Sequence, residues 1–125
     1  GDGRRVMRRI YIDFRSIRLV TPELRQSLIS HHYLPQEGTT TEVNLTLFRH
    51  WADSYLASHP LVNSDMTHMV RQLEATQQGL PVEFYFFLKE KEWKTWENQK
   101  DEILERLYAA MQDFDLSIYQ LGIRN

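Results

Sequence analysis

The stretch from Gly79 to Leu88 constrains the fold most, because it is the most aromatic run in the chain. A glycine and a proline punctuate its start, and β-branched and aromatic residues favour a pleated, half-buried strand. Side chains alternate between the two faces of a strand. One face is uniformly apolar and must lie on a core: Val82, Phe84, Phe86 and Leu88. The other face is mixed: Glu83, Tyr85 and Phe87. We therefore predict a central strand over 82–88.

The bulk composition is that of one globular domain. The chain has 125 residues, 42% of them hydrophobic, with six Phe, six Tyr and three Trp, which is enough to fill a core. A formal net charge of -2 removes the electrostatic footprint of a general nucleic-acid binder. The lack of cysteine excludes disulfides and thiolate metal sites. No apolar run approaches the roughly 20 residues that span a bilayer. We predict a single domain over 1–125 that is not itself inserted in a membrane. Because it starts on Gly1 rather than Met, we expect a fragment of a larger protein.

The first strand is predicted around Ile10, Ile12 and Phe14, which alternate with polar residues. Four arginines precede this alternation: Arg4, Arg5, Arg8 and Arg9. They either form a solvated strand start or pair with a neighbouring domain or subunit. Capping residues, prolines and apolar periodicity predict the remaining elements. Before the central strand we expect a helix opening at Thr21-Pro22 and ending by about residue 34, a loop over 35–43, a helix from about 46 to 59 and a strand over 66–73. After it we expect a long helix from Trp93 to Phe114, a short strand over 116–120 and a tail over 121–125.

This order of elements predicts an α+β fold of the ferredoxin-like β-α-β-β-α-β type, with a four-stranded antiparallel sheet and helices on one face. Helices on one face leave the other face of the sheet open. By alternation, we expect four aromatic side chains to point toward that open face: Tyr11, Tyr85, Phe87 and Tyr119. An exposed aromatic patch on a sheet usually marks a contact surface.

The residue types that carry catalysis or bind metals show no functional spacing. The five glycines form no phosphate-binding loop. His31 and His32 are adjacent, whereas helical metal ligands stand four residues apart. The acids between Glu90 and Glu105 are interspersed with lysines and are interpreted as a solvated helix face, with a paired-carboxylate acid–base site as the alternative. We predict no catalytic residue, no metal site and no cofactor, and therefore no enzyme.

Several segments, in their order and spacing, resemble the cytosolic C-terminal region of the small-conductance mechanosensitive channel family, in its miniconductance branch. The likeness runs from about residue 3 to residue 120. The segments that carry it are Gly3-Arg4-Arg5, Arg9-Ile10-Tyr11-Ile12-Asp13, Ser16-Ile17-Arg18-Leu19, Asn44-Leu45-Thr46-Leu47-Phe48-Arg49, Tyr55-Leu56, His59-Pro60, Met66 to Leu73, Gly79 to Phe86, Trp93, Asp101 and Phe114. One departure is the stretch from His31 to Val43, which is short and polar where larger family members carry a longer segment.

The resemblance implies a bacterial inner-membrane channel that opens under bilayer tension and releases solutes in hypo-osmotic shock. In such channels an upstream β domain and an α/β domain build a hollow cytosolic vestibule, typically from seven subunits. This chain would be that α/β domain on the cytoplasmic side, with residues 1–8 joining the β domain and with a structural role in a homo-oligomer. The pore helices of the family have no counterpart here. Subunit or domain contacts are then expected at Arg4, Arg5, Arg8, Arg9, Tyr11, Tyr85, Phe87 and Tyr119.

Other functions stay open from the residues alone. Sheets of this type often bind ligands between subunits, so a small-molecule sensor or interaction module is the main alternative. Aromatic residues on a four-stranded sheet can stack RNA bases, but the Lys/Arg-Gly-aromatic pattern of that class is missing from 82–88. A small phosphatase-type enzyme shares the fold without the required phosphate loop. Trp93 and Trp96 are interpreted as core or interface anchors rather than as a ligand-stacking pair.

Overall fold

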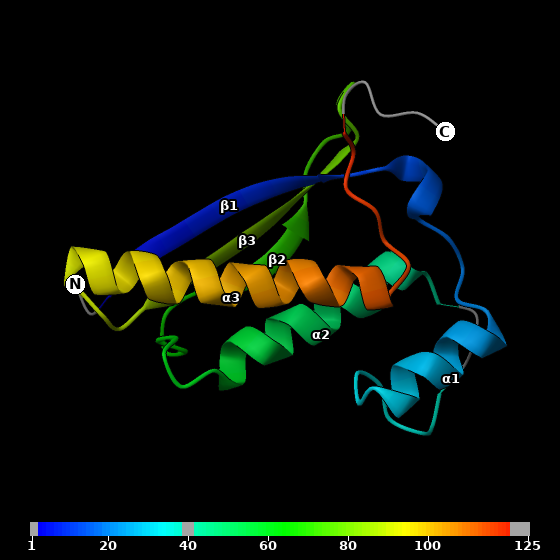
Figure 1. Ribbon diagram of the computed structural model, residues 1–125, viewed down its shortest axis with the longest axis horizontal. Helices are drawn as coiled ribbons and strands as arrows, with labels where there is room; N and C mark the ends of the chain where they lie inside the picture. Colours follow the sequence, from blue (N-terminus) through cyan, green and yellow to red (C-terminus); the bar gives the residue numbers. More distant parts are fainter. Residues whose placement is uncertain (1–2, 39–41, 121–125) are drawn as a thin grey trace.

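The computed structural model describes residues 3–38 and 42–120 (Figure 1). Its elements are β1 (Arg4–Ile12), a 3-10 helix η1 (Phe14–Ser16), α1 (Pro22–Ser30), α2 (Asn44–Ser58), β2 (Met69–Gln72), β3 (Leu80–Leu88) and α3 (Trp93–Asp113). They form a mixed α+β domain with three helices and, among the described residues, a three-stranded antiparallel sheet. Of the segments predicted as junction, loop and tail, residues 1–2, 39–41 and 121–125 lie outside the described residues.

The sheet is built around β3. The strand order is β1-β3-β2, and both neighbours run antiparallel to β3. β1 pairs along its whole length, from Arg4 opposite Leu88 to Ile12 opposite Leu80. The predicted central strand and its hairpin with β2 are therefore confirmed. β2 is shorter than the predicted strand over 66–73.

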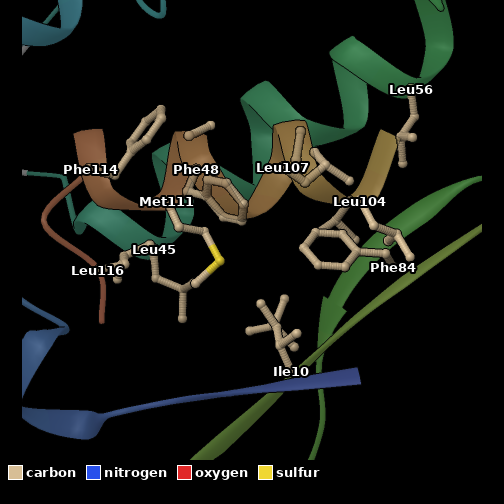
Figure 2. Close-up of a cluster of buried hydrophobic side chains, with 14 of the residues drawn as sticks. Ile10, Leu45, Phe48, Leu56, Phe84, Leu104, Leu107, Met111, Phe114 and Leu116 are labelled. Atoms are coloured by element: carbon tan, nitrogen blue, oxygen red, sulfur yellow. The ribbon is translucent and has the colours of Figure 1, made fainter. Parts of the chain in front are cut away.

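The core lies between the sheet and the two long helices. The predicted inner face of β3 is fully buried, with its four apolar side chains at 0% exposure: Val82, Phe84, Phe86 and Leu88. Phe48 of α2 meets Phe84 edge-to-face at 6.3 Å and Phe114 at 5.5 Å between ring centroids. Leu104, Leu107 and Met111 of α3 complete the layer (Figure 2). The apolar stripe of α3 is buried at Ile103, Leu104, Leu107 and Met111, whereas Trp96 near the helix start is half-buried.

The sequence predicted the start of α1 correctly but placed the start of α2 about two residues too late. Thr21 caps α1 as predicted, because its Oγ1 accepts a 3.1 Å hydrogen bond from the Leu24 amide. α2 begins at Asn44 rather than near residue 46. The Asn44 side chain is buried: its amide donates to the carbonyl oxygens of Ser16 and Phe114, both at 2.9 Å, and its Oδ1 accepts from the Arg18 amide at 3.0 Å. Asn44 thus ties three distant segments together.

The predicted strand over 116–120 is present only as a single bridge. Ile118 pairs with Ile12, and the Tyr119 amide donates to the Tyr11 carbonyl at 2.8 Å. The described sheet therefore has three strands rather than four. The chain reverses after α3 through Asp115, whose φ of 60° is left-handed, and reaches the sheet only at the last residues of β1.

Two large side chains predicted to be apolar-face residues are exposed instead. Phe14 does not continue β1, because the Asp13 carboxylate accepts from the Arg15 amide and caps η1. Trp93 is the first residue of α3 and is 65% exposed. Contact of α3 with β1 begins one turn later, where Trp96 Nε1 lies 3.4 Å from the Arg4 carbonyl oxygen. None of the described helices has the length and apolar character needed to cross a membrane.

Candidate functional site

The candidate site is the face of the sheet opposite α2 and α3 (Figure 1). Strand alternation and register define its members, and we call this set the outer face. It consists of Arg5, Met7, Arg9 and Tyr11 on β1, Met69 and Arg71 on β2, and Pro81, Glu83, Tyr85 and Phe87 on β3. No described helix covers it. The structure thereby places side chains from all three strands on one surface.

The centre of the outer face is apolar. Tyr85 and Phe87 are half-buried and meet edge-to-face, with ring centroids 5.7 Å apart and an interplanar angle of 81°. Met7 and Met69 stand opposite Tyr85 on the two neighbouring strands. Met7 is 51% exposed. Methionine is flexible and packs well against aromatic rings, so this group can adapt to an apolar surface placed over it.

A buried carboxylate lies beside the apolar centre. Glu83 is 0% exposed, although it belongs to the uncovered side of the sheet. Arg9 Nε donates to its Oε2 at 3.2 Å from one side, and Arg71 Nε donates to its Oε1 at 2.9 Å from the other. The two guanidinium groups cover the carboxylate while staying about half exposed themselves, at 53% and 48%. We call this three-strand arrangement the Glu83 clamp.

The clamp fixes the charge of Glu83. Burial by itself raises the pKa of a carboxyl group, because it disfavours the charged form. Here the hydrogen bonds and positive charges of Arg9 and Arg71 outweigh burial, and the pKa of Glu83 lies below its ordinary value. Glu83 is therefore ionised at neutral pH. The terminal Nη atoms of Arg9 make no hydrogen bond among the described residues, and they remain donors toward solvent or a partner.

The four N-terminal arginines divide between the two sides of the sheet. Arg5 and Arg9 belong to the outer face, and the Arg5 guanidinium lies 6.0 Å from the Tyr85 ring centroid. Arg4 and Arg8 lie on the helix side. The Arg4 guanidinium lies 4.8 Å from the Trp96 ring centroid, and Arg8 Nη1 lies 3.4 Å from the Tyr108 hydroxyl oxygen. The eight predicted contact residues therefore do not form one surface.

The two remaining predicted aromatics occupy the end of the sheet. Tyr11 is opposite Pro81 on the outer face. Tyr119 follows the single bridge to β1 and lies beside Gly79, where a Cβ would come 3.5 Å from that of Tyr119 and would clash with the Ile12 carbonyl oxygen. Gly79 has a φ of 106°, so glycine suits both the conformation and the close approach. Both tyrosines are half-buried and lie away from the Tyr85–Phe87 centre.

Four members of the outer face escaped sequence reasoning: Met7, Met69, Arg71 and Pro81. Alternation alone could place Glu83 on this side, but pairing between strands brings Arg9 and Arg71 to its two flanks. In the sequence, the sign of the Glu83 clamp is a single acidic residue, Glu83, on the mixed face of the central strand. Such a buried acid requires cationic partners on the adjacent strands.

A second polar region lies between α1 and α2. A cavity of about 350 Å³ is bordered there by Arg25, Tyr33, His50, Trp51 and Ser54, among others. Arg25 is buried, and its guanidinium approaches the Glu42 carboxylate at 3.8 Å. These groups could hold a small polar molecule.

Histidine and carboxylate side chains are dispersed over the described residues. No group of three or more His, Cys, Asp or Glu side chains is arranged there to hold a metal ion. His68 pairs with Asp53 at 2.8 Å near the surface. His31 and His32 do not converge on a common site: His31 Nδ1 contacts the Ser27 carbonyl oxygen at 2.7 Å.

No protein-family model matches this chain. The family resemblance therefore rests on the ordered sequence segments alone.

Proposed function

We propose that this chain is the cytosolic α/β domain of a small-conductance mechanosensitive channel of the miniconductance branch. The parent protein would lie in the bacterial inner membrane, with this domain on its cytoplasmic side, and would release solutes in hypo-osmotic shock. The domain acts in assembly and support of a homo-oligomeric, typically heptameric vestibule and performs no catalysis. In this proposal the fold is ferredoxin-like, and the segment after Leu116 completes a fourth strand beside β1.

The observation that carries the proposal is the outer face. Exposed apolar groups on one face of a sheet usually serve a contact. Met7, Tyr85 and Phe87 supply such a group, and Arg5 and Arg9 border it with positive charge. Aromatic, methionine and arginine side chains are the types enriched at protein interfaces. A vestibule subunit requires a surface of this kind against a neighbouring subunit or domain.

The attachment of β1 to α3 supports the same role. The chain would arrive from the upstream β domain at the start of β1, whose first residue is Arg4; residues 4–8 of the predicted junction are already paired with β3 in this sheet. The Arg4 guanidinium lies over Trp96, which Lys100 also approaches at 5.2 Å. Lys100 in turn pairs with Glu97 at 2.6 Å. A load applied at the start of β1 would therefore reach the long helix directly.

The test compares two substitutions in the full-length parent protein. Met7→Glu places a carboxylate in the centre of the outer face, whereas Leu19→Glu makes the same change at an apolar residue that is 61% exposed away from that face. We expect Met7→Glu to reduce oligomer assembly, patch-clamp currents and survival of hypo-osmotic shock, because a desolvated carboxylate disfavours the contact. The Leu19→Glu protein should behave as the unmodified parent.

Deletion of the whole domain provides the broader control. Loss of assembly or of tension-gated currents is the expected result. A parent protein that assembles, gates and protects cells normally without residues 4–120 would contradict the supporting role.

The alternative proposal is a small-molecule sensor, and the cavity beside Arg25 favours it. A ligand that binds the native state alone raises the unfolding temperature by mass action. A thermal-shift screen of amino acids and nucleotides should then give at least one hit that Trp51→Ala abolishes. If no ligand shifts the transition, the sensor proposal loses its support.

A further inference from the structure

Helix α3 carries an exposed row whose chemistry complements the outer face. Trp93, Glu97, Asp101 and Glu105 follow one another at intervals of four residues, so they form a single ridge of the helix surface. Trp93 is the most exposed large apolar side chain of the described chain, at 65%. Asp101 and Glu105 are exposed as well. We call this row the α3 ridge.

The acids of the ridge are only partly neutralised within the chain. Lys100 contacts Glu97 at 2.6 Å and Asp101 at 3.5 Å. Glu105 and its neighbour Glu102 form no ion pair among the described residues. The ridge therefore presents an apolar ring at its start and negative charge along its length. The outer face presents the matching pair of properties, an apolar Met7–Tyr85–Phe87 centre and three arginines.

We propose that the outer face of one copy binds the α3 ridge of a second copy. Trp93 of the second copy would lie over Met7 and Tyr85, and its acidic side chains would approach Arg5 and the outward atoms of Arg9 and Arg71. Trp and Arg side chains are the types that most often dominate interface energies. The inference rests on the proposed function, since it names the partner of the outer face within the homo-oligomer.

The two surfaces make the contact head-to-tail. α3 packs on the inner side of the sheet, so the ridge and the outer face lie on different sides of the molecule (Figure 1). A contact between two different surfaces repeats from copy to copy, and it closes into a ring when the rotation between copies permits. A contact of the outer face with itself would instead stop at a two-fold dimer.

The experiment uses complementary variants of this 125-residue chain. The face variant carries Arg5→Glu and Met7→Glu, and it leaves the Glu83 clamp intact. The ridge variant carries Trp93→Ala and Glu105→Lys, both at exposed helix positions. Circular dichroism confirms that each is folded. Sedimentation velocity over a concentration series then measures each variant alone, the unmodified chain and a one-to-one mixture of the variants.

The unmodified chain should associate with rising concentration, and each variant alone should remain monomeric. The mixture should form a one-to-one dimer that does not grow, because each variant retains the surface that the other lacks. A mixture that contains only monomers overturns the proposal. So does a ridge variant that still dimerises alone, since that result identifies contact between two outer faces.

Disulfide trapping gives a second readout that tolerates weak binding. The chain contains no cysteine, so Met7→Cys and Glu97→Cys, the ridge position one turn from Trp93, each introduce a single thiol. Oxidation of the mixed proteins should yield the mixed dimer in several-fold excess over either self-linked dimer. A random distribution of the three products would contradict the contact.

The outcomes separate this inference from the proposed function. If Met7→Glu abolishes channel assembly while the mixed variants stay monomeric, the channel role stands and the ridge is the wrong partner. If the mixed dimer forms while Met7→Glu leaves osmotic survival unchanged, the contact stands and the channel role fails.

Discussion

The two faces of β3 come from one strand but follow different physical rules. The inner face is Val82, Phe84, Phe86 and Leu88, and helices bury all four completely. The outer face alternates with it as Glu83, Tyr85 and Phe87, and no described helix covers it. Glu83 is nonetheless as buried as the inner residues, because Arg9 and Arg71 close over it. Burial on the inner side reflects apolar packing, whereas burial on the outer side reflects charge pairing.

The comparison distinguishes residues that stabilise the fold from residues that are available for contact with another molecule. Inner-face side chains interlock with α2 and α3, so changes there are expected to unfold the domain. No described helix packs on the outer-face side chains Met7, Tyr85 and Phe87, so changes there are expected to affect association more than changes at the inner face do. The Glu83 clamp stands between these cases, since it is part of the outer face and also joins three strands.

The largest loss of folding stability is expected for a substitution at the inner face of β3. Phe84→Ala removes a fully buried ring that packs against Phe48 and Tyr108. We expect the free energy of unfolding to fall by about 3–5 kcal/mol. Urea denaturation followed by circular dichroism measures this loss. A decrease below about 1 kcal/mol would mean that the two faces do not differ as described.

The second-largest loss of folding stability is expected for a change in the Glu83 clamp. Glu83→Gln keeps the size of the side chain and removes the charge that Arg9 and Arg71 share. We expect a loss of about 1–3 kcal/mol, which is the range for hydrogen bonds to charged groups, and the half-exposed arginines favour its lower end. Glu74→Gln, an exposed acid outside the clamp, is the matched control and should be neutral. Equal stability of the two variants would show that the clamp contributes nothing.

The third prediction follows from the lowered pKa of Glu83. A carboxyl group with a lower pKa in the folded state stabilises the fold above its unfolded pKa, near 4.5. That contribution is lost as pH falls through the folded value. The stability difference between the unmodified chain and Glu83→Gln should therefore be full at pH 7 and should shrink on acidification below the ordinary glutamate range. Urea denaturation at pH 7 and at successively lower pH measures it. A difference that stays constant with pH would contradict ionisation of Glu83.

The smallest effect on stability is expected at the centre of the outer face. Met7→Ser removes an apolar side chain that is already half exposed, so the free energy of unfolding should change by about 0.5 kcal/mol or less. Self-association of the chain should nevertheless weaken. Parallel denaturation and sedimentation measurements test both parts. A loss comparable with that of Phe84→Ala would place Met7 in the core rather than on a contact surface.

Sequence predicted those features that depend on neighbours along the chain. Alternation predicted both faces of β3, and the Thr21-Pro22 pair predicted the start of α1. Features that depend on distant partners were missed. Strand register decides that Arg9 and Arg71 flank Glu83, and the buried Asn44 amide depends on carbonyl groups of Ser16 and Phe114.

The predicted contact residues show the same limit. Alternation correctly placed Tyr85 and Phe87 on the uncovered side. The cluster of N-terminal arginines looked like one basic patch in the sequence, but a strand sends alternate residues to opposite faces. Arg4 and Arg8 therefore meet α3, while Arg5 and Arg9 join the outer face. The exposure of Trp93 depends on where α3 first reaches β1, and helical periodicity carries no information on that point.

The most direct test of the outer face as a contact surface is thiol labelling of Met7→Cys in a cysteine-free, full-length parent protein. Labelling rates are compared between the isolated 125-residue chain and the assembled protein, with Leu19→Cys as the control. We predict rapid labelling of Met7→Cys in the isolated chain at a concentration where it is monomeric and strong protection in the assembly, while Leu19→Cys reacts alike in both. Equal labelling of Met7→Cys in the two states would contradict the account.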